Sequence, residues 1–271
     1  NMENILVSIP GANGRMGKTL IGLILEHNKF DLAQATCLPG EDEEGMDIGL
    51  LVGKGKISKE LKSDSLDLFN NSDVLIDFTV PEATIFHAKK CYENNMSIVI
   101  GTTGLSVSQE KELTTLSKKI PIVYSANFSV GVTLLSNLVS KATKTLGIEW
   151  NIEILEMHHK HKVDAPSGTA LMLGKSAAQA RGKHLSDIKS VSRDGIIGER
   201  KNDEIGFAVL RGGDVVGEHS VLFSNSGERI ELSHKATDRS IFAAGALRAS
   251  YWAANANPGL YSLSDVLEKG G

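Results

Sequence analysis

The chain has 271 residues, of which 41% are hydrophobic and 23% are charged, and its formal net charge is −4. This composition excludes a largely disordered chain and predicts a folded protein with one large domain or two ordinary ones. The slightly acidic balance argues against broad binding to nucleic acid or to acidic membranes, so we expect neither as a partner.

Cysteine usage and hydropathy bear on the compartment. Cys37 and Cys91 have neither metal-ligand nor disulfide spacing, which predicts buried thiols in a reducing environment. No apolar run approaches the ~20 residues that span a bilayer, and the sequence shows no secretory signal. We therefore expect a cytoplasmic protein without a membrane partner.

A glycine-rich turn follows the first predicted strand. The strand covers residues 5–9, the turn reads Gly-Ala-Asn-Gly-Arg-Met-Gly at 11–17, and residues 20–25 follow helical spacing. Strand, turn and helix are typical of a phosphate-binding βα unit, in which Gly14 admits the backbone to a pyrophosphate and Gly17 lets the helix pack on the strand. Ala12 stands where the dinucleotide pattern usually has its first glycine.

The same turn nearly forms the loop of nucleoside-triphosphate enzymes. Gly17-Lys18-Thr19 matches the end of that motif, and residues 74–77 could be the strand that delivers a magnesium-binding Asp77. The motif requires four residues between its two glycines, whereas Gly11 leaves five. A P-loop phosphotransferase is kept as an alternative.

Strands and helices alternate through the first half of the chain. Further strands are predicted at residues 31–38, 74–78, 97–100 and 122–124. Pro81 suits the first turn of a helix, and Ser106 with Gln109 has the spacing of a capping box. Alternation predicts a parallel sheet whose ligands bind at the carboxyl ends of the strands, so residues 101–103 and 126–128 are expected to touch a cofactor. The acidic residues at 41–44 are expected to form a solvated turn.

The pattern changes after about Asn127. A helix is predicted over residues 132–145, and strands are predicted at 152–157, 205–210, 215–216, 220–223 and 229–233. This strand-rich segment is typical of a mixed or antiparallel sheet. Residues 193–202 are expected to be a long mobile loop and residues 241–252 the final helix.

Three histidines and two lysines occupy residues 158–162, at the end of the strand predicted over 152–157. Ser167 is the predicted N-cap of the next helix, and Gly168 would let an anion approach the free N–H groups of that helix. Lysines there would bind carboxylates or phosphates, and a histidine would exchange a proton near neutral pH. A solvated basic loop is the alternative. We expect no metal site, because adjacent His158 and His159 do not easily share one ion and no cysteine pair completes a site.

Seven stretches carry a family resemblance. They are Gly-Ala-Asn-Gly-Arg-Met-Gly at 11–17, Asp-Phe-Thr-Val-Pro at 77–81, Gly-Thr-Thr-Gly at 101–104, Ala-Asn-Phe-Ser-Val-Gly at 126–131, His-His-Lys-His-Lys-Val-Asp-Ala-Pro-Ser-Gly-Thr at 158–169, Ile-Gly-Phe-Ala at 205–208 and Gly-Asp-Val-Val-Gly-Glu-His at 213–219. Together, and in this order along nearly the whole chain, they resemble the 4-hydroxy-tetrahydrodipicolinate reductase family, long called dihydrodipicolinate reductase. The stretch at 158–169 is the most specific.

The resemblance implies an α/β fold with two domains. A Rossmann-like parallel sheet domain would comprise residues 1–126 and 239–271 and bind the dinucleotide. A second, α+β domain with a mixed or antiparallel sheet would comprise residues 127–238, bind the substrate and form a homotetramer.

The resemblance also assigns site residues. His158 is implied as the proton donor and acceptor and Lys162 as the second proton donor. The substrate-binding residues are implied as His159, Ser167, Gly168, Thr169 and Thr103. The cofactor-binding residues are implied as Gly11, Ala12, Asn13, Gly14, Arg15, Met16, Phe78, Gly101, Thr102, Thr103, Ser125, Ala126, Asn127 and Phe128.

By this resemblance the protein would be an NAD(P)-dependent oxidoreductase of diaminopimelate and lysine biosynthesis. It would reduce a small cyclic dicarboxylate, 4-hydroxy-tetrahydrodipicolinate, to tetrahydrodipicolinate with NADH or NADPH. Cys37-Leu38 stands where family members commonly have an acidic residue followed by Arg, so we expect weak discrimination between the two cofactors. A non-catalytic dinucleotide sensor is a further alternative, although it would have little use for the cluster at 158–162.

Overall fold

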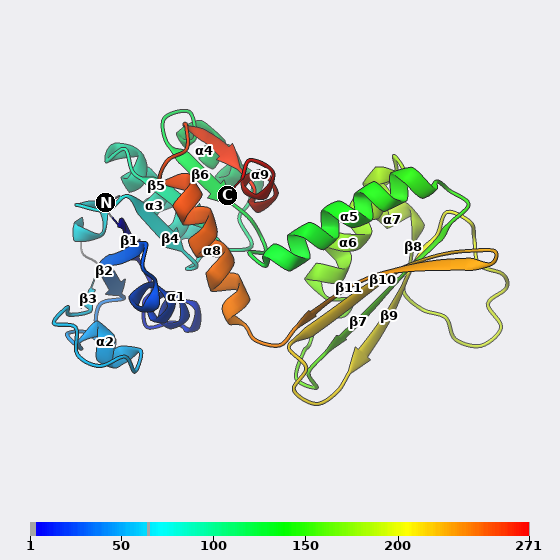
Figure 1. The fold of residues 1–271 in the computed structure, drawn as a ribbon, viewed down its shortest axis with the longest axis horizontal. Coiled ribbons are helices and arrows are strands. Elements are labelled where there is room, and N and C mark those ends of the chain that lie inside the picture. Colours follow the sequence, from blue (N-terminus) through cyan, green and yellow to red (C-terminus); the bar gives the residue numbers. More distant parts are fainter. Residues whose placement is uncertain (1–3, 64–65, 271) are drawn as a thin grey trace. The chain divides into compact units, whose positions relative to one another are not determined.

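The computed structural model describes residues 4–63 and 66–270 (Figure 1). By its internal contacts the chain forms two compact units. The first unit comprises Asn1–Val130 with Ser240–Gly271, and the second comprises Gly131–Arg239. No helix in the described ranges combines the length and the apolar character that crossing a bilayer requires.

A parallel sheet of seven strands forms the centre of the first unit, in the order β12-β6-β5-β4-β1-β2-β3. Its strands are β1 (Ile5–Ile9), β2 (Phe30–Cys37), β3 (Lys62–Ser63), β4 (Val74–Asp77), β5 (Ser97–Ile100), β6 (Pro121–Tyr124) and β12 (Gly259–Tyr261). The helical elements are α1 (Arg15–Glu26), α2 (Ile48–Leu51), the 3₁₀ helix η1 (Leu66–Phe69), α3 (Pro81–Glu93), α4 (Val107–Leu116), α8 (Ser240–Ala253) and α9 (Leu263–Glu268).

Both faces of this sheet carry an apolar core. Along β4 the side chains alternate, so that Val74 and Ile76 join a cluster with α1 and α8, whereas Leu75 joins a second cluster with α3 and α4. Strands buried on both faces explain why the sequence of this half reads as short continuous apolar runs. Cys37 and Cys91 are free buried thiols within these cores, as predicted.

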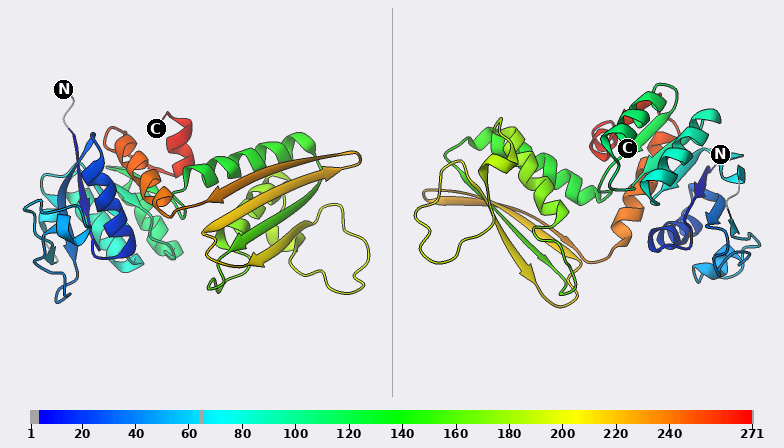
Figure 2. Two further views of the ribbon diagram at one scale, coloured as in Figure 1. Left: turned by 60° about the horizontal axis from the view of Figure 1, so that its bottom comes forward. Right: turned by 180° about the vertical axis from the view of Figure 1, so that it is seen from behind.

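The second unit contains a mixed sheet of five strands in the order β11-β10-β7-β9-β8. Its strands are β7 (Asn151–His158), β8 (Lys189–Ser190), β9 (Ile205–Arg211), β10 (Gly217–Asn225) and β11 (Glu228–Ala236). The neighbouring helices are α5 (Val130–Leu146), α6 (Gly168–Ala180) and α7 (Leu185–Ile188). β10 runs antiparallel to β7 and β11, whereas β7, β8 and β9 are parallel. The helices lie on one face of the sheet (Figure 2).

The predicted combination of a parallel α/β sheet with a mixed α+β sheet is confirmed. Two element predictions are wrong. Residues 215–216 are not a strand, because the Val215 carbonyl accepts a hydrogen bond of 2.8 Å from the His159 N–H and β10 begins only at Gly217. The helix predicted at 241–252 is present as α8, but β12 and α9 follow it.

The loop predicted at residues 193–202 is anchored rather than free. Arg193 donates to both carboxylate oxygens of Glu153 on β7, at 2.7 and 2.8 Å, and Arg200 Nε donates to Glu153 Oε1 at 2.8 Å. Space for this cluster exists because residue 206 is glycine, where a Cβ would lie 2.0 Å from Glu153 Oε2. Two arginines thus hold the loop to the sheet.

Candidate active site

The glycine turn after β1 leaves the start of α1 open. Gly11 has a φ of +63°, and the Gly14 N–H donates to the Gly11 carbonyl at 3.1 Å. Gly14 is the N-cap of α1 and makes no side-chain capping bond. A Cβ on Gly17 would lie 2.4 Å from the Gly11 oxygen and 2.7 Å from the Ala12 Cα, so the turn closes only around glycine. The first N–H groups of α1 are therefore placed to bind an anionic group such as a pyrophosphate.

The neighbouring strand ends meet at the same edge of the sheet. Phe78 follows β4 and Phe128 follows β6, and their rings pack edge to face with centroids 5.7 Å apart. A Cβ on Gly101, which follows β5, would lie 2.0 Å from the Phe78 ring, so glycine makes room for this packing. Phe128 is 1% exposed and Ala12 is fully buried. These two residues are thus part of the core that supports the strand ends.

A buried carboxylate ties this edge together. Asp77, at the end of β4, is fully buried and accepts from the Thr79 N–H at 2.8 Å and from the Thr79 hydroxyl at 2.6 Å. His87 Nδ1 lies 2.8 Å from its other oxygen, Oδ2, and the Thr102 hydroxyl lies 3.4 Å from Oδ1. Asp77 is thus used to position the turns after β4 and β5, which disfavours its reading as a magnesium ligand. The residues that sequence reasoning had not assigned here are Thr79 and His87.

The P-loop alternative is disfavoured at the other end of the turn too. The Thr19 hydroxyl donates to the Arg15 carbonyl within α1 at 2.9 Å, and the Lys18 ammonium lies 3.6 Å from Glu43. In a loop of that type the lysine contacts phosphates and the threonine hydroxyl contacts magnesium, whereas here both groups are bound to other parts of the protein.

Glu43 and Glu44 are not simply solvated, in contrast to the prediction. The Asn13 amide donates to Glu43 at 3.3 Å, so the acidic loop reaches the glycine turn. This hydrogen bond, aided by Lys18, lowers the pKa of Glu43. Glu44 accepts from the Gly40 N–H at 3.0 Å and from the Ser63 hydroxyl. A carboxylate is therefore held beside the turn although the end of β2 is Cys37.

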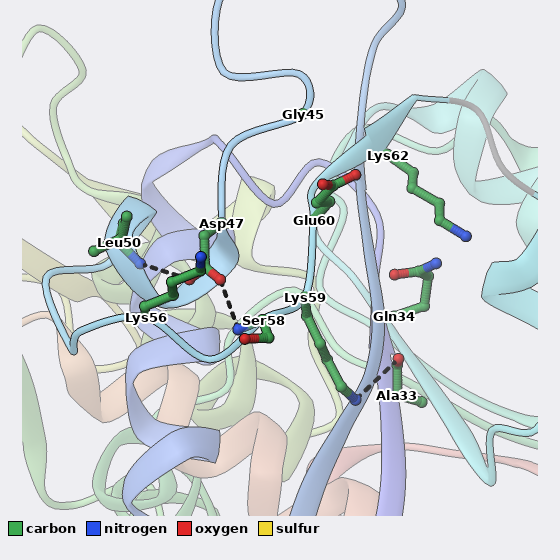
Figure 3. A pocket seen from close by; sticks show the side chains of 10 residues that line it. All are labelled: Ala33, Gln34, Gly45, Asp47, Leu50, Lys56, Ser58, Lys59, Glu60 and Lys62. Atoms are coloured by element: carbon green, nitrogen blue, oxygen red, sulfur yellow. Dashed lines mark hydrogen bonds between the residues drawn. The ribbon is translucent and has the colours of Figure 1, made fainter.

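A hollow of about 710 Å³ in the first unit lies beside β2 (Figure 3). Asp47 on its wall accepts four backbone N–H groups at 2.7–3.2 Å, and Lys59 donates to the carbonyls of Leu32 and Ala33. Both charged side chains thus bind backbone groups of the protein itself. None of the predicted site residues lines this hollow.

In the second unit, His158 stands at the end of β7. It is 8% exposed, and its Nδ1 lies 2.6 Å from Oε2 of Glu156, which is 1% exposed. Arg211 donates to both oxygens of Glu156, at 2.8 and 3.1 Å, and the Ser167 N–H donates at 2.9 Å. Burial alone would raise the pKa of Glu156, but hydrogen bonds from Arg211, His158 and Ser167 outweigh burial and lower it.

The loop after β7 carries the lysine of the predicted site. Its backbone is fixed by hydrogen bonds from the His159 N–H to Val215 and from the Lys160 N–H to Gly213. The Lys162 ammonium lies 2.7 Å from Asp164 Oδ1. A cavity of about 630 Å³ opens beside this loop and is lined by His159, Lys160, His161, Gly213, Asp214 and Arg239.

His159 faces this cavity together with Arg239. The Arg239 guanidinium lies 3.4 Å from His159 Nε2. Loss of hydration and the positive charges of Arg239 and His161 lower the pKa of His159. Two groups that can bind carboxylates are thus presented to the cavity, of which only His159 was predicted.

Ser167 is the N-cap of α6, as predicted. Its hydroxyl accepts from the Ala170 N–H at 3.1 Å and lies 2.9 Å from His219 Nε2. A Cβ on Gly168 would meet nothing within 4 Å, so the first turn of α6 is open to an approaching anion. Burial, followed by the charge of His158, lowers the pKa of His219 to about 4, so its imidazole is neutral at neutral pH.

The structure groups most of the predicted residues at two places. His158, His159, Lys162, Ser167, Gly168 and Thr169 surround the end of β7 and the start of α6. Thr103 belongs to the first unit, where it follows β5 with the predicted cofactor-binding residues. Sequence reasoning did not assign Glu156, Arg211, His219 or Arg239 to the site. Strand alternation could have placed Glu156 on the face of His158, and His219 ends the family-like stretch at 213–219, but no local signal indicates Arg211.

Comparison with known proteins identifies the family. Residues 131–267 match the family "Dihydrodipicolinate reductase, C-terminus" and residues 5–128 match "Dihydrodipicolinate reductase, N-terminus". The 4-hydroxy-tetrahydrodipicolinate reductase of Parvibaculum lavamentivorans is 48% identical over 265 residues, which cover 97% of this chain and 98% of that protein. The protein of the same name from Afipia carboxidovorans is 47% identical over 269 residues, covering 99% of each.

A solved structure gives the same result. The dipicolinate-bound dihydrodipicolinate reductase from Paenisporosarcina sp. TG-14 superposes with a TM-score of 0.75 at 26% identity, covering 96% of this chain and 97% of that one. An amine dehydrogenase from Mycobacterium smegmatis, at 12% identity and a TM-score of 0.62, shares the fold. The chain belongs to the dihydrodipicolinate reductase family, which confirms the resemblance.

Proposed function

We propose that this family member reduces 4-hydroxy-tetrahydrodipicolinate to tetrahydrodipicolinate with NADH or NADPH, in the diaminopimelate route to lysine. One observation carries the proposal: a histidine held by a buried carboxylate stands beside the open N-terminus of α6. A proton-exchanging group next to an anion-binding helix end suits a reaction that protonates a cyclic dicarboxylate.

The substrate carboxylates are assigned to the start of α6 and the adjacent loop. Gly168 and Thr169 begin α6, Ser167 fixes the start of that helix, and His159 faces the neighbouring cavity. Arg239 joins this set as a cation beside His159. Two carboxylates on one ring require two such anion-binding points, which gives the site its preference for a dicarboxylate. Thr103 is assigned to the substrate by the family pattern.

Proton transfer is assigned to His158 and Lys162. Hydride addition leaves negative charge on the conjugated ring system, which an acid at hydrogen-bonding distance must quench. His158 is the proton donor and acceptor of this assignment. Lys162, held by Asp164 at 2.7 Å, is the second donor.

The nicotinamide cofactor is assigned to residues 1–126 with 239–271, and the substrate to residues 127–238. The cofactor supplies the hydride when bound. Glycine at 14 and 17 leaves the start of α1 free for its pyrophosphate. The backbone of the turns at 101–103 and 125–128 would line the nicotinamide half, with Phe78 packed between strand ends.

A cytoplasmic homotetramer is also part of the proposal. The face of the mixed sheet away from the helices carries Leu155 and Leu210, which are 36% and 49% exposed. Apolar side chains on an uncovered sheet face favour association with other copies of the chain. Sedimentation velocity measures this directly, and a monomer at micromolar concentration contradicts it.

The decisive experiment measures oxidation of NADH and NADPH with freshly made 4-hydroxy-tetrahydrodipicolinate. We expect substrate-dependent loss of absorbance at the reduced nicotinamide band. Magnesium-dependent hydrolysis of ATP or GTP without nicotinamide oxidation would instead support the P-loop alternative. Cofactor binding without turnover would support the sensor.

A further inference from the structure

Glu156 is the most deeply buried acidic group of the second unit's site. It lies on β7, two residues before His158, and both side chains point to the helix-covered face of the sheet. At 1% exposure its carboxylate is closed off from solvent. Glu156 is therefore not placed to touch a substrate, and any role that it has in the site must act through the residues that it contacts.

The contacts of Glu156 fix its chemical state. Oε1 accepts from the Ser167 N–H at 2.9 Å and from Arg211 Nη2 at 3.1 Å, and Oε2 accepts from Arg211 Nη1 at 2.8 Å. Guanidinium and backbone N–H groups only donate, so the carboxylate acts as an ionised acceptor at all three contacts. The fourth contact, 2.6 Å to His158 Nδ1, then requires that Nδ1 carries the proton.

The other ring nitrogen of His158 follows from this. With Nδ1 bound to Glu156, a neutral imidazole has its lone pair on Nε2. Nε2 lies beside residue 217, where a Cβ would come within 3.0 Å, so a glycine gives it room. Nε2 is thus the nitrogen at which a proton can be exchanged.

We propose that Glu156 is a positioning residue that fixes His158 as its Nδ1–H tautomer and sets Nε2 as the proton-exchanging atom. The inference rests on the proposed role of His158. The same carboxylate holds the Ser167 N–H, so one buried group sets both the acid and the anion-binding end of α6. Arg211 balances its charge and also donates to the Asp164 carbonyl at 2.7 Å, next to the Lys162 loop.

Glu156→Gln separates these roles from simple packing. The amide keeps the size of the side chain but replaces one acceptor with an NH₂ donor. That NH₂ group must face Arg211 and either His158 or Ser167. The Ser167 N–H can only donate, whereas His158 Nδ1 can change from donor to acceptor, so we expect the NH₂ group to face His158. This favours the Nε2–H tautomer, in which Nδ1 accepts and Nε2 no longer has a free lone pair.

The kinetic test compares Glu156→Gln with Glu218→Gln. Glu218 lies on the neighbouring strand β10, opposite Met157, and pairs only loosely with Lys235 at 3.5 Å. We expect Glu156→Gln to lower kcat about 100-fold, the cost of a misplaced reacting group, with little change in the dissociation constant of NADH. Glu218→Gln should keep wild-type turnover. Wild-type kcat in Glu156→Gln would overturn the proposal.

The spectroscopic test reads the tautomer itself. Magic-angle-spinning NMR of protein labelled with ¹⁵N-histidine distinguishes Nδ1–H from Nε2–H imidazole, and the His158 signal is identified by its loss in His158→Gln. At a pH where the imidazole is neutral, wild-type His158 should be the Nδ1–H form, and Glu156→Gln should shift it toward Nε2–H. The proposal is contradicted if His158 is the Nε2–H tautomer in the wild type, or if Glu156→Gln leaves the tautomer of His158 unchanged.

Two further measurements keep the outcomes separate. Thermal unfolding and titration with pyridine-2,6-dicarboxylate show whether Glu156→Gln folds and binds. If Glu156→Gln does not fold, the tautomer of His158 in the wild type still tests the proposal. These measurements need no turnover. A protein without reductase activity would therefore contradict the proposed function, while the NMR spectra would still test whether Glu156 sets the tautomer of His158.

Discussion

The Lys162 ammonium lies 2.7 Å from Oδ1 of Asp164, two residues further along the same loop. The hydrogen bond from Lys162 lowers the pKa of Asp164, so the pair is held as ammonium and carboxylate. Asp164 therefore restrains a long flexible side chain that is otherwise only one-fifth exposed. This ion pair therefore fixes the position of the Lys162 side chain within the loop that follows His158.

Removing either assigned proton donor should slow turnover without affecting cofactor binding. We expect His158→Gln and Lys162→Ala each to lower kcat at least ~100-fold, the low end of general acid–base contributions. NADH affinity, measured by fluorescence titration, should change less than about twofold, because the assigned cofactor residues lie in the first unit. Near wild-type turnover in both variants would show that the assignments are wrong.

Gly17 should tolerate no side chain. In Gly17→Ala the new Cβ would lie 2.4 Å from the Gly11 oxygen and force the turn to move. We expect a lower melting temperature and about tenfold weaker NADH binding, equal to about 1.4 kcal/mol. Gly22→Ala is the control within the same helix, since a Cβ there meets nothing within 4 Å. It should stabilise the protein by about 0.5–1 kcal/mol, and equal effects of both variants would contradict the turn argument.

Ser167→Ala should weaken both the fold and dicarboxylate binding. The variant loses the N-cap of α6 and the contact with His219, at a cost of about 1 kcal/mol. Ser106→Ala is the matched control, because Ser106 caps α4 in the first unit. Calorimetric titration with pyridine-2,6-dicarboxylate should show weaker binding only in Ser167→Ala. Equal affinity in the two variants would remove Ser167 from the binding site.

Glu153 should make the second unit sensitive to acid. Burial alone would raise the pKa of Glu153, but hydrogen bonds from Arg193 and Arg200 outweigh it and lower the pKa. A group with a depressed folded pKa stabilises fully above its unfolded pKa, about 4.3, and loses this contribution as pH falls through the folded value. The melting temperature of wild type should therefore fall more steeply below about pH 4 than that of Glu153→Gln. Glu228→Gln, on β11, should follow the wild-type curve.

Cofactor preference should be small. Cys37 offers no carboxylate to the ribose, and Glu43 beside Asn13 is paired with Lys18. We expect kcat/KM for NADH and NADPH to differ by less than about 100-fold at one salt concentration. Glu43→Gln should shift the ratio toward NADPH, because it removes a negative charge near the glycine turn. A larger preference, unchanged by this substitution, would place the determinant elsewhere.

Local signals in the sequence were reliable. Pro81 begins α3, Ser106 and Gln109 form the predicted capping box, and Ser167 caps α6. Each of these depends on residues no more than three positions apart. The strand-turn-helix pattern at β1 and α1 is equally local, and both sheet types were predicted from the order of strands and helices along the chain.

The missed features depend on distant contacts. Arg211 reaches Glu156 from 55 residues away, and His219 reaches Ser167 from 52 residues away. The Glu153 cluster joins three segments, and residues 215–216 leave the sheet because Val215 binds the His159 N–H. Long-range pairing of this kind has no period in the sequence, so no pattern indicates it.

The return of the chain to the first unit has a consequence for the order in which the two units fold during translation. The Ser97 hydroxyl on β5 donates to the Ala253 carbonyl on α8, 156 residues later, and β12 adds the last strand beside β6. A nascent chain ending near residue 239 has translated the whole second unit but lacks the helix that covers one face of the first sheet. On the ribosome the second unit can therefore complete its core first, while the first unit cannot complete its core until the last 32 residues have emerged.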